Sequence, residues 1–426
     1  MGADRPAPVR SGPVTVTVPA PRPGPGSFPV GFVWGVATAA HQIEGGNVNN
    51  DWWAWEHDPG SPCAEPSGDA CDSFHRWPED LDLVAGLGLG AYRFSLEWSR
   101  IEPADGEFSR AALEHYRRIC AGCADRGIQA AVTFHHFTLP RWLARRGGFE
   151  ATDFPERFAR YVRRAADHLG DLIDLGCTLN EPNILGLLGY RLGLFPPGVS
   201  DRTDRADGVG RSLVRAHRLA VEELRAGRAA FPVGVTVAMA EMVALPGGEE
   251  VAAAARNDLE DRFLAATAGD DFVGVQAYTR MRFGPDGLAP PEPGVAVTQM
   301  GYEFWPNAAA HAVRRAAEAT GLPVVVTENG IATDDDARRI DYLHQALSGV
   351  ARCLADGVDV RGYVAWSLLD NFEWTYGFGP TFGLFSVDRR TFERRAKPSA
   401  AWYGAVARAN RLPGPSAAPG GDGQSS

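Results

Sequence analysis

Short apolar runs alternate with longer amphipathic stretches along most of the chain. Eight runs are rich in β-branched or aromatic residues and predict strands, and Gly or Pro often stands where a run begins. They lie at residues 31–37, 90–96, 129–135, 174–180, 233–239, 272–277, 323–328 and 361–367. Stretches rich in Ala, Arg, Leu and Glu separate most of them and predict helices, such as 109–126, 154–169 and 338–356. The chain is therefore predicted to have an α/β fold.

The alternation favours one α/β architecture. Eight strands separated by helices over one continuous stretch are typical of a single (β/α)8 TIM barrel, whose active site lies at the C-terminal ends of the strands. A doubly wound sheet is the alternative, but the one Gly-rich candidate for its phosphate loop, residues 86–90, enters a strand instead of leaving one. We expect one barrel over residues 28–412, although 426 residues suffice for about three domains.

The two ends of the chain differ from the rest in composition. Residues 1–27 contain seven prolines and no apolar stretch of the kind found in a signal peptide, which predicts a Pro-rich flexible tail. Residues 413–426 are rich in Pro, Gly, Ser and Ala and are predicted to be a second flexible tail. No apolar run is long enough to span a membrane, and we expect a cytoplasmic protein.

Composition excludes several function classes. The chain has 42 basic and 53 acidic residues and a net charge of −11, which argues against nucleic acid or an anionic membrane as its partner. The single lysine, Lys397, precedes Pro398. This excludes a G-K-[ST] phosphate loop and the lysine set of a protein kinase, and nothing around Lys397 indicates a pyridoxal site.

The six cysteines are too sparse for a disulfide scaffold. Cys120 and Cys123 have C-x-x-C spacing but stand in a predicted helix without a second pair, so we interpret them as core residues and not as a zinc or redox site. Cys63 and Cys71 lie in one loop-like stretch and would be able to pair if oxidised. The sequence predicts no metal and no cofactor.

Polar and aromatic side chains gather where the predicted strands end. Two of them are glutamates, Glu181 just after the fourth strand and Glu328 at the end of the seventh. One glutamate in such a place is more often a helix cap or an ion-pair partner. Two on separate strands of one barrel would converge on a shared cavity, and a carboxyl pair about 5 Å apart suits retaining glycoside hydrolysis. A neighbouring negative charge keeps one carboxyl protonated, and donors keep the other ionised.

Around these residues the sequence resembles glycoside hydrolase family 1, the β-glucosidase family. The resemblance covers about residues 28–404 and rests on several motifs in a fixed order. They are Y-R-F-S-L-E-W-S-R-I at 92–101, T-F-H-H-F-T-L-P at 133–140, T-L-N-E-P-N at 178–183, V-T-E-N-G at 326–330, W-S-L-L-D-N-F-E-W at 366–374, F-G-L-F-S-V-D at 382–388 and K-P-S-A-A-W-Y at 397–403. It implies a retaining β-glycosidase, most simply a β-glucosidase, that takes a small-molecule β-glycoside and needs no cofactor.

The resemblance implies catalytic roles for five residues. Glu328 would attack the anomeric carbon, and Arg93 and Tyr278 would hydrogen-bond it and hold it ionised. Glu181 would protonate the glycosidic oxygen and then deprotonate the incoming water. Asn180 would bind the sugar 2-hydroxyl, a contact that strengthens in the oxocarbenium-like transition state.

Other matching positions imply a sugar pocket. Its substrate-binding residues would be Gln42, His136, Gln276, Trp366, Glu373, Trp374 and Phe382. Trp366 would be the platform under the ring, and Phe382 would help to close the pocket. Glu373 would bind the 4- and 6-hydroxyls. A carboxylate there repels a 6-phosphate, and the lysine of phospho-glycosidases is absent, so the expected substrates are non-phosphorylated β-glucosides, with β-galactosides or β-fucosides as further candidates.

Four departures from the family pattern bear on sugar and aglycone preference. Phe137 stands where the family has Trp, and Gln276 opens a Q-A-Y sequence in place of N-Y-Y. The segment 240–270 is shorter than usual, and 47–72 is a Trp-rich, loop-like stretch on which an aglycone could stack.

Two alternatives remain at this point: a transglycosylase or natural-product deglycosylase on the same fold, and a non-catalytic sugar-binding barrel. The sequence leaves the oligomeric state open.

Overall fold

The computed structural model describes residues 26–200, 203–227 and 230–413. The two predicted tails, 1–27 and 413–426, lie outside these residues except at their inner ends. The main hydrophobic cluster of the described part includes residues from Phe28 to Leu412, and three smaller clusters lie beside it. The range of the main cluster supports the proposal that residues 28–412 form one domain.

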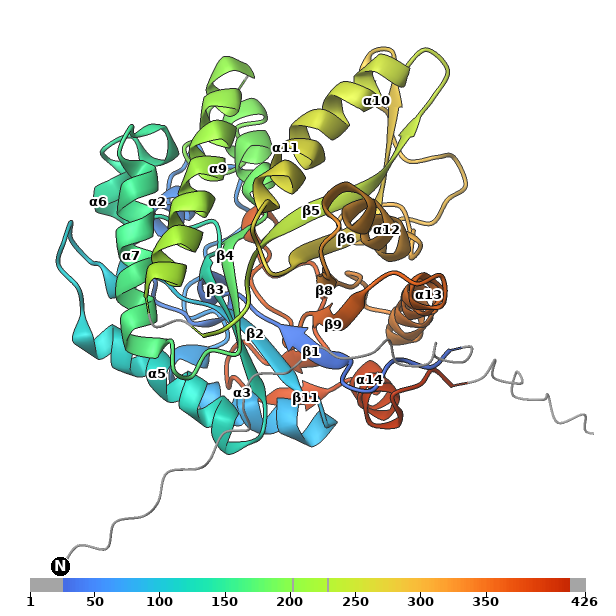
Figure 1. The fold of residues 1–426 in the computed structure, drawn as a ribbon, viewed down its shortest axis with the longest axis horizontal. Helices are drawn as coiled ribbons and strands as arrows, with labels where there is room; N and C mark the ends of the chain where they lie inside the picture. The colour runs from blue at the N-terminus through green and yellow to red at the C-terminus, as the bar shows by residue number, and fades with distance from the viewer. Residues whose placement is uncertain (1–25, 201–202, 228–229, 414–426) are drawn as a thin grey trace, which may run out of the picture.

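Eight parallel strands form a closed barrel at the centre of the molecule, and helices surround it (Figure 1). The order around the barrel is β5-β4-β3-β2-β1-β9-β8-β6, and the pairing of β5 with β6 closes it. The strands are β1 (Val33–Ala37), β2 (Ala91–Ser95), β3 (Gln129–His135), β4 (Leu175–Asn180), β5 (Val233–Ala244), β6 (Val273–Gly284), β8 (Val324–Asn329) and β9 (Val360–Trp366). The predicted TIM barrel and all eight predicted strands are confirmed.

Three shorter strands lie outside the barrel and were not predicted. β7 (Gly287–Leu288) pairs antiparallel with the end of β6, and β10 (Phe385–Val387) pairs with β11 (Arg394–Ala396) in a separate sheet. β5 and β6 also run past their predicted ends and pair from Glu241 and Arg280 to Ala244 and Phe283. The rim of the barrel is therefore highest between these two strands.

The helices follow the strands in the order expected of this fold. The α-helices are α1 (Ala40–Ile43), α2 (Asp51–Glu56), α3 (Ser73–Leu87), α4 (Trp98–Ile101), α5 (Arg110–Asp125), α6 (Arg141–Ala144), α7 (Phe154–Leu169), α8 (Pro182–Ile184), α9 (Thr203–Ala226), α10 (Glu249–Arg256), α11 (Arg262–Leu264), α12 (Ala308–Thr320), α13 (Asp336–Ala355) and α14 (Pro398–Ala409). Short 3-10 segments are η1 (Gly148–Glu150), η4 (Ala265–Thr267) and η5 (Trp374–Tyr376), and η2 (Leu185–Arg191) and η3 (Asn257–Asp261) are π-helical. No helix in the described part of the chain is both long and apolar enough to cross a membrane.

Local sequence explains where the long helices begin and which face they bury. α5 starts after Ser109, whose hydroxyl accepts a hydrogen bond from the amide of Ala112. α7 buries Phe158, Val162 and Ala165 at the helical spacing of three to four residues, so one stripe packs on the barrel. The three helices predicted from the sequence are confirmed to within two residues at each end.

The Trp-rich stretch at 47–72 was predicted to be loop-like, and this is wrong for its first part. Asn50 caps α2 by accepting from the amide of Trp53, so Trp52 is carried inward and is only 1% exposed. Trp52 packs against Phe195 and Trp374 and is a core residue instead of an open stacking surface. Cys63 and Cys71 are both free in the structure.

A buried ion pair joins the C-terminal sheet to the helix layer. Arg394 Nε donates to Asp80 Oδ1 at 2.8 Å, and its Nη2 contacts Asp80 Oδ2 and Ser73 Oγ at 3.3 Å. Both charged side chains are at most 2% exposed. Removing one partner would leave the other charge buried and unpaired, which costs more than the pair itself contributes.

Arg394→Met is therefore expected to lower the free energy of unfolding by about 3–5 kcal/mol. The neighbouring Arg395 pairs with Glu393 at the surface, where both side chains are more than half exposed, so Arg395→Met is the matched control and should change little. Urea denaturation followed by tryptophan fluorescence measures both. Equal effects of the two substitutions would contradict the role assigned to the buried pair.

Candidate active site

The strand register brings the predicted catalytic residues to one level of the barrel. Arg93 on β2 and Trp366 on β9 both pair with Ala37 of β1. On the other side of the barrel, Gln276 pairs with Glu328. Ala37, Trp366 and Glu328 lie at or next to the carboxyl ends of their strands, where parallel barrels place their chemistry. The register brings Arg93 and Gln276 to the same level, although β6 continues beyond Gln276 to Gly284.

Two donors from other strands hold Glu328. Arg93 Nη1 lies 2.5 Å from Glu328 Oε1, and the Tyr278 hydroxyl donates to Oε2 at 2.7 Å. Burial raises the pKa of Glu328, and the Arg93 charge and the hydrogen bonds from Tyr278 and Arg93 oppose that rise. The carboxylate is thus fixed in position, with both oxygens engaged by groups that stabilise its charged form.

Arg93 also orients the amide of Asn180. Its Nη2 donates to Asn180 Oδ1 at 2.6 Å, and Gln276 Nε2 donates to the same oxygen at 2.9 Å. With its oxygen occupied, Asn180 presents its Nδ2 group, which lies 3.1 Å from His136 Nε2. Gln276, the longer amide at the departure from the family pattern, therefore still joins the network.

Glu181 stands at a sharp change of direction. It follows β4 directly, precedes Pro182 at the start of α8, and has a left-handed backbone with φ of 44°. Its amide donates to Thr236 O at 2.8 Å, which ties the turn to β5. A non-glycine residue in this conformation costs about 1–3 kcal/mol and persists only where the surroundings impose it.

The surroundings of the two glutamates separate their protonation states. Burial raises the pKa of Glu181 well above its usual range, and the charges of Glu328 and Glu373 raise it further, while Arg93 acts in the opposite sense. Arg93 lies in direct contact with Glu328 but not with Glu181. Glu181 is therefore the carboxyl that keeps its proton, and Glu328 is the one that ionises first.

A second polar cluster surrounds Glu373. Gln42 Nε2 donates to Phe372 O at 2.8 Å, to Asn371 Oδ1 at 3.1 Å and to Glu373 Oε2 at 3.3 Å. The pKa of Glu373 is raised to about 8, first by burial and then by the charge of Glu328, while hydrogen bonds from Gln42 and Trp366 lower it. Glu373 is therefore available as a hydrogen-bond donor as well as an acceptor near neutral pH.

Three residues of this site carry buried polar atoms without a hydrogen-bond partner among the described residues. They are Gln42 Oε1, Gln276 Oε1 and His136 Nδ1. A buried polar atom left unpaired costs about 1–3 kcal/mol. His136 Nε2 accepts from Asn180 Nδ2, so Nδ1 carries the proton of the neutral ring. The hydroxyl groups of a polyol would therefore donate to both amide oxygens and accept from His136 Nδ1.

Aromatic rings complete the site. His136 stacks near Trp366 and Trp374, with ring centroids 6.2 Å and 5.9 Å apart. Trp366 and Phe382 share a small apolar cluster against which Tyr278 packs. The structure thus brings all twelve predicted site residues to the C-terminal end of the barrel: Gln42, Arg93, His136, Asn180, Glu181, Gln276, Tyr278, Glu328, Trp366, Glu373, Trp374 and Phe382.

Comparison with known proteins agrees with this geometry. The model of glycosyl hydrolase family 1 matches residues 25–273 and 275–412, which is nearly all of the described chain. The chain belongs to glycosyl hydrolase family 1. It is therefore a glycoside hydrolase, and the predicted family membership is confirmed.

Individual family 1 relatives match over most of their length. β-Glucosidase A of Thermotoga maritima is 32% identical, over 90% of this chain and 98% of that protein. A bifunctional β-D-glucosidase/β-D-fucosidase of Bifidobacterium breve is 33% identical, over 88% of this chain and 97% of that protein. The crystal structure of the β-glycosidase BGL167 superposes with a TM-score of 0.86 at 49% identity, covering 92% of this chain and 100% of the other.

One supporting group of this family 1 site was missed in the sequence. His41 stacks on Trp374, with ring centroids 5.7 Å apart and planes at 16°. Its Nδ1 lies 3.0 Å from Asn50 Nδ2, and its Nε2 lies 3.2 Å from Glu56 Oε2. Because the cap of α2 uses Asn50 Oδ1, the amide NH2 faces His41, so Nδ1 accepts and Nε2 carries the proton. The residues of α2 thereby orient the ring behind Trp374.

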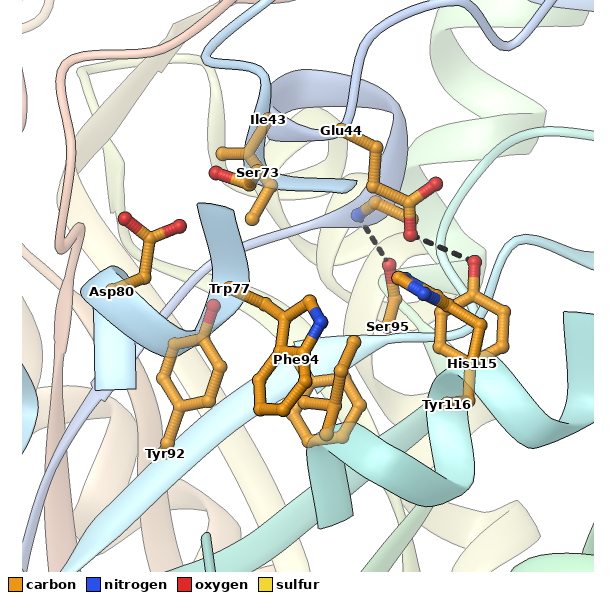
Figure 2. A pocket seen from close by; sticks show the side chains of 12 residues that line it. Ile43, Glu44, Ser73, Trp77, Asp80, Tyr92, Phe94, Ser95, His115 and Tyr116 are labelled. Carbon is orange, nitrogen blue, oxygen red and sulfur yellow. Dashed lines mark hydrogen bonds between the residues drawn. The ribbon is translucent and has the colours of Figure 1, made fainter. Parts of the chain in front are cut away.

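A small cavity lies outside the barrel wall, between β2, α3 and α5 (Figure 2). Its volume is about 20 Å³, enough for roughly one water molecule. Figure 2 shows Tyr92 and Phe94 of β2 facing it, and Glu44 accepting a hydrogen bond from Tyr116 at its edge. This cavity is too small for a sugar and lies on the face of β2 opposite Arg93, so it is separate from the family 1 site.

Tyr278→Phe tests the hydrogen bond to Glu328 in this family 1 site. That bond lowers the pKa of Glu328, so its loss should raise the pKa and move the acid limb of the kcat/KM profile to higher pH. The loss of a bond to a charged group should also reduce kcat/KM roughly ten- to a hundredfold at the pH optimum. A profile measured with an aryl β-glucoside checks both. An acid limb that stays in place or moves to lower pH would contradict the contact.

Proposed function

We propose that this chain is a retaining, exo-acting β-glucosidase that hydrolyses terminal, non-phosphorylated β-D-glucosides through a covalent glycosyl-enzyme. The observation that carries the proposal is the fixed position of Glu328 between Arg93 and Tyr278, with Glu181 kept protonated within reach of its charge. One ionised and one protonated carboxyl are the two groups that this reaction needs.

The reaction then proceeds in two displacements. The Glu328 carboxylate forms a bond to the anomeric carbon while the bond from that carbon to the glycosidic oxygen breaks. Glu181 gives its proton to the departing oxygen. In the second step the Glu181 carboxylate takes a proton from water, the water oxygen bonds to the anomeric carbon, and Glu328 is released. Two inversions leave the β configuration unchanged.

The remaining site residues bind the sugar in this proposal. Asn180 Nδ2 binds the 2-hydroxyl, because Arg93 and Gln276 already occupy its oxygen. The free oxygens of Gln42 and Gln276 accept from other hydroxyls. Trp366 lies under the ring, where an indole face suits the apolar face of a pyranose.

The chemistry around Glu373 supports a substrate without phosphate. A phosphate dianion beside Glu373 would lie within reach of the negative charge of Glu328, which already raises the pKa of Glu373. The only lysine, Lys397, donates to Asp370 Oδ1 at 2.7 Å and is already paired. The relative from Bifidobacterium breve is a bifunctional β-D-glucosidase/β-D-fucosidase, and the β-glucosidase of Thermotoga maritima has been solved in complex with galacto-hydroximolactam. We propose β-fucosides and β-galactosides as secondary substrates.

The anomer released first decides the mechanism. Hydrolysis of 4-nitrophenyl β-D-glucoside followed by proton NMR should show β-glucose before mutarotation produces the α anomer. Inclusion of methanol should give methyl β-glucoside, and its share measures transfer against hydrolysis. Initial release of α-glucose, or no turnover, would contradict the proposal.

We also propose a cytoplasmic location. All six cysteines are free, and five of them are buried. Such unpaired, inert thiols are typical of a reducing compartment.

A further inference from the structure

β4 contains one residue more than β5 at the level of the site. Cys177 pairs with Gly234 of β5, and the next pair is Asn180 with Thr236. Three steps along β4 therefore match two steps along β5. Such an extra residue is a β-bulge, which is often found next to active sites and changes the direction of the side chain that follows it.

The bulge allows two residues of β4 to face the barrel interior although they are three positions apart. Cys177 lies in a small apolar cluster with Phe272 and Val325. Val325 is on β8, which is not a neighbour of β4 in the barrel, so this cluster crosses the interior. In a regular strand Asn180 would face the opposite way from Cys177, because side chains alternate. The bulge turns it inward, to its contact with Arg93.

Thr178, the first residue of the bulge, faces the helix layer outside the barrel. Its Oγ1 is hydrogen-bonded to His217 Nδ1 at 2.7 Å. His217 belongs to α9, which packs against β4 (Figure 1). Both residues are at most 2% exposed. The bulge is therefore held from the side opposite to the site.

His217 is held in turn by Asp270, in the segment between η4 and β6. Its Nε2 lies 3.2 Å from Asp270 Oδ2, without the alignment of a hydrogen bond, and both side chains are 2% exposed. The amide of the next residue, Asp271, donates to Val233 O of β5 at 2.9 Å. Asp270, His217 and Thr178 thus form one buried chain of contacts that links this segment to the bulge.

The bulge also has a contact on the side of the site. Leu179 O accepts from the Thr236 hydroxyl at 3.3 Å, and the Thr236 carbonyl accepts from the amide of Glu181 at 2.8 Å. The bulge is therefore fixed from inside by Thr236 and from outside by His217. Glu181 follows it by two residues, so a shift of the bulge would move the carboxyl. Displacement of a reacting group by about 1 Å can lower a rate roughly a hundredfold.

We propose that His217 is a positioning residue: through Thr178 it fixes the bulge of β4 and thereby aims Glu181 at the glycosidic oxygen. This inference rests on the proposed β-glucosidase function. His217 lies outside the barrel wall and does not touch the substrate. Its loss should weaken proton donation by Glu181, whereas Glu328, on β8, should keep its position and its attack on the anomeric carbon.

The test compares two substrates that share one sugar and differ in their need for an acid: dinitrophenyl and methyl β-D-glucoside. Thr178→Val keeps the shape of the side chain and removes the hydroxyl, so it should raise the dinitrophenyl-to-methyl ratio of kcat/KM about tenfold. His217→Phe should have the same effect. Thr178→Ser keeps the hydroxyl and should keep the wild-type ratio. A ratio measured on one preparation does not depend on the fraction of folded protein, and a change in sugar binding affects both substrates alike.

His115→Phe is the matched control. His115 is a second buried histidine on an outer helix, α5; it is 4% exposed, and its Nε2 has no hydrogen-bond partner among the described residues. This substitution should leave the ratio unchanged. The double variant Thr178→Val/His217→Phe tests whether the two residues act as a pair. Its ratio should be no larger than that of either single variant, because each substitution breaks the same contact.

Each other outcome overturns a specific claim. Thr178→Val decides the question by itself if His217→Phe does not fold, and equal losses on both substrates or an unchanged ratio would overturn the positioning role. A raised ratio in Thr178→Ser or His115→Phe, or a multiplied effect in the double variant, would overturn the assignment to the contact between Thr178 and His217. In all these cases a wild type that hydrolyses both glucosides leaves the β-glucosidase proposal standing. A wild type that hydrolyses neither would overturn the proposed function, and this inference with it.

Discussion

Glu328→Ala is expected to reduce kcat for an aryl β-glucoside by about 10⁴-fold or more, because Glu328 is the carboxylate that would form the covalent intermediate. Arg93 and Tyr278, from two other strands, hold the two carboxylate oxygens of Glu328 in place. A water molecule that filled the space left by the side chain would not be held in the position of the attacking oxygen. Steady-state release of 4-nitrophenol measures the loss. Glu318→Ala, an exposed glutamate on α12, is the control and should retain full activity.

Azide distinguishes loss of the nucleophile from loss of the fold. In Glu328→Ala the cavity left by the side chain admits azide, which attacks the anomeric carbon of an activated substrate and gives α-glucosyl azide, the inverted product. Glu328→Gln keeps the volume of the side chain and should not respond to azide. Circular dichroism shows whether each variant is folded. An active Glu328→Ala variant, or β-glucosyl azide as its product, would sink the assignment of Glu328 as the nucleophile.

Glu181→Ala is expected to act differently on good and poor leaving groups. Without the acid, hydrolysis of an alkyl glucoside should fall about 10²- to 10⁴-fold, because the departing oxygen is no longer protonated. A dinitrophenyl glucoside needs no such proton, so glycosyl-enzyme should still form at a rapid rate and then accumulate. The alkaline limb of the kcat/KM profile, which reports deprotonation of Glu181 as pH rises through its raised pKa, should also disappear.

Azide again gives a stereochemical readout for this variant. In Glu181→Ala it attacks the glycosyl-enzyme without needing a base, so the product should be β-glucosyl azide, with retention. The two glutamate variants thus predict opposite anomers from the same reagents. Identical anomers from both variants would exclude the assignment of one acid/base and one nucleophile.

The barrel was predictable because its signals are local and repeated. Each strand begins as a short apolar run, often entered from Gly or Pro, and long helices such as α7 bury a stripe at 3.6-residue spacing. Glu181 and Glu328 each follow or end a predicted strand. Because the carboxyl ends of parallel strands lie at one end of a barrel, the sequence predicted both glutamates there. The exact partners of each carboxyl depended on the family resemblance and not on periodicity.

Other parts of the site depend on contacts between distant segments. Phe137, Glu181 and Trp374 all have positive φ, a conformation that no local signal for these residue types indicates. The helical form of residues 51–56 depends on the Asn50 cap and on Trp52 packing under Trp374. The hydrogen bond from the Thr381 amide to Gln299 Oε1, at 2.9 Å, joins two loops of the barrel mouth that are more than 70 residues apart along the chain. Single-sequence patterns contain no information about such pairs.

The guanidinium of Arg93 has a consequence for how this enzyme can change. Its two terminal nitrogens bind Glu328 and Asn180 separately, and the group is a rigid planar fork. The spacing between the Glu328 carboxylate and the Asn180 amide oxygen is therefore set by the covalent geometry of one side chain. Loops around the barrel mouth can vary in sequence without disturbing that spacing. Changes in the loops would therefore alter which alcohol is released, and Arg93 would preserve which bond is cleaved.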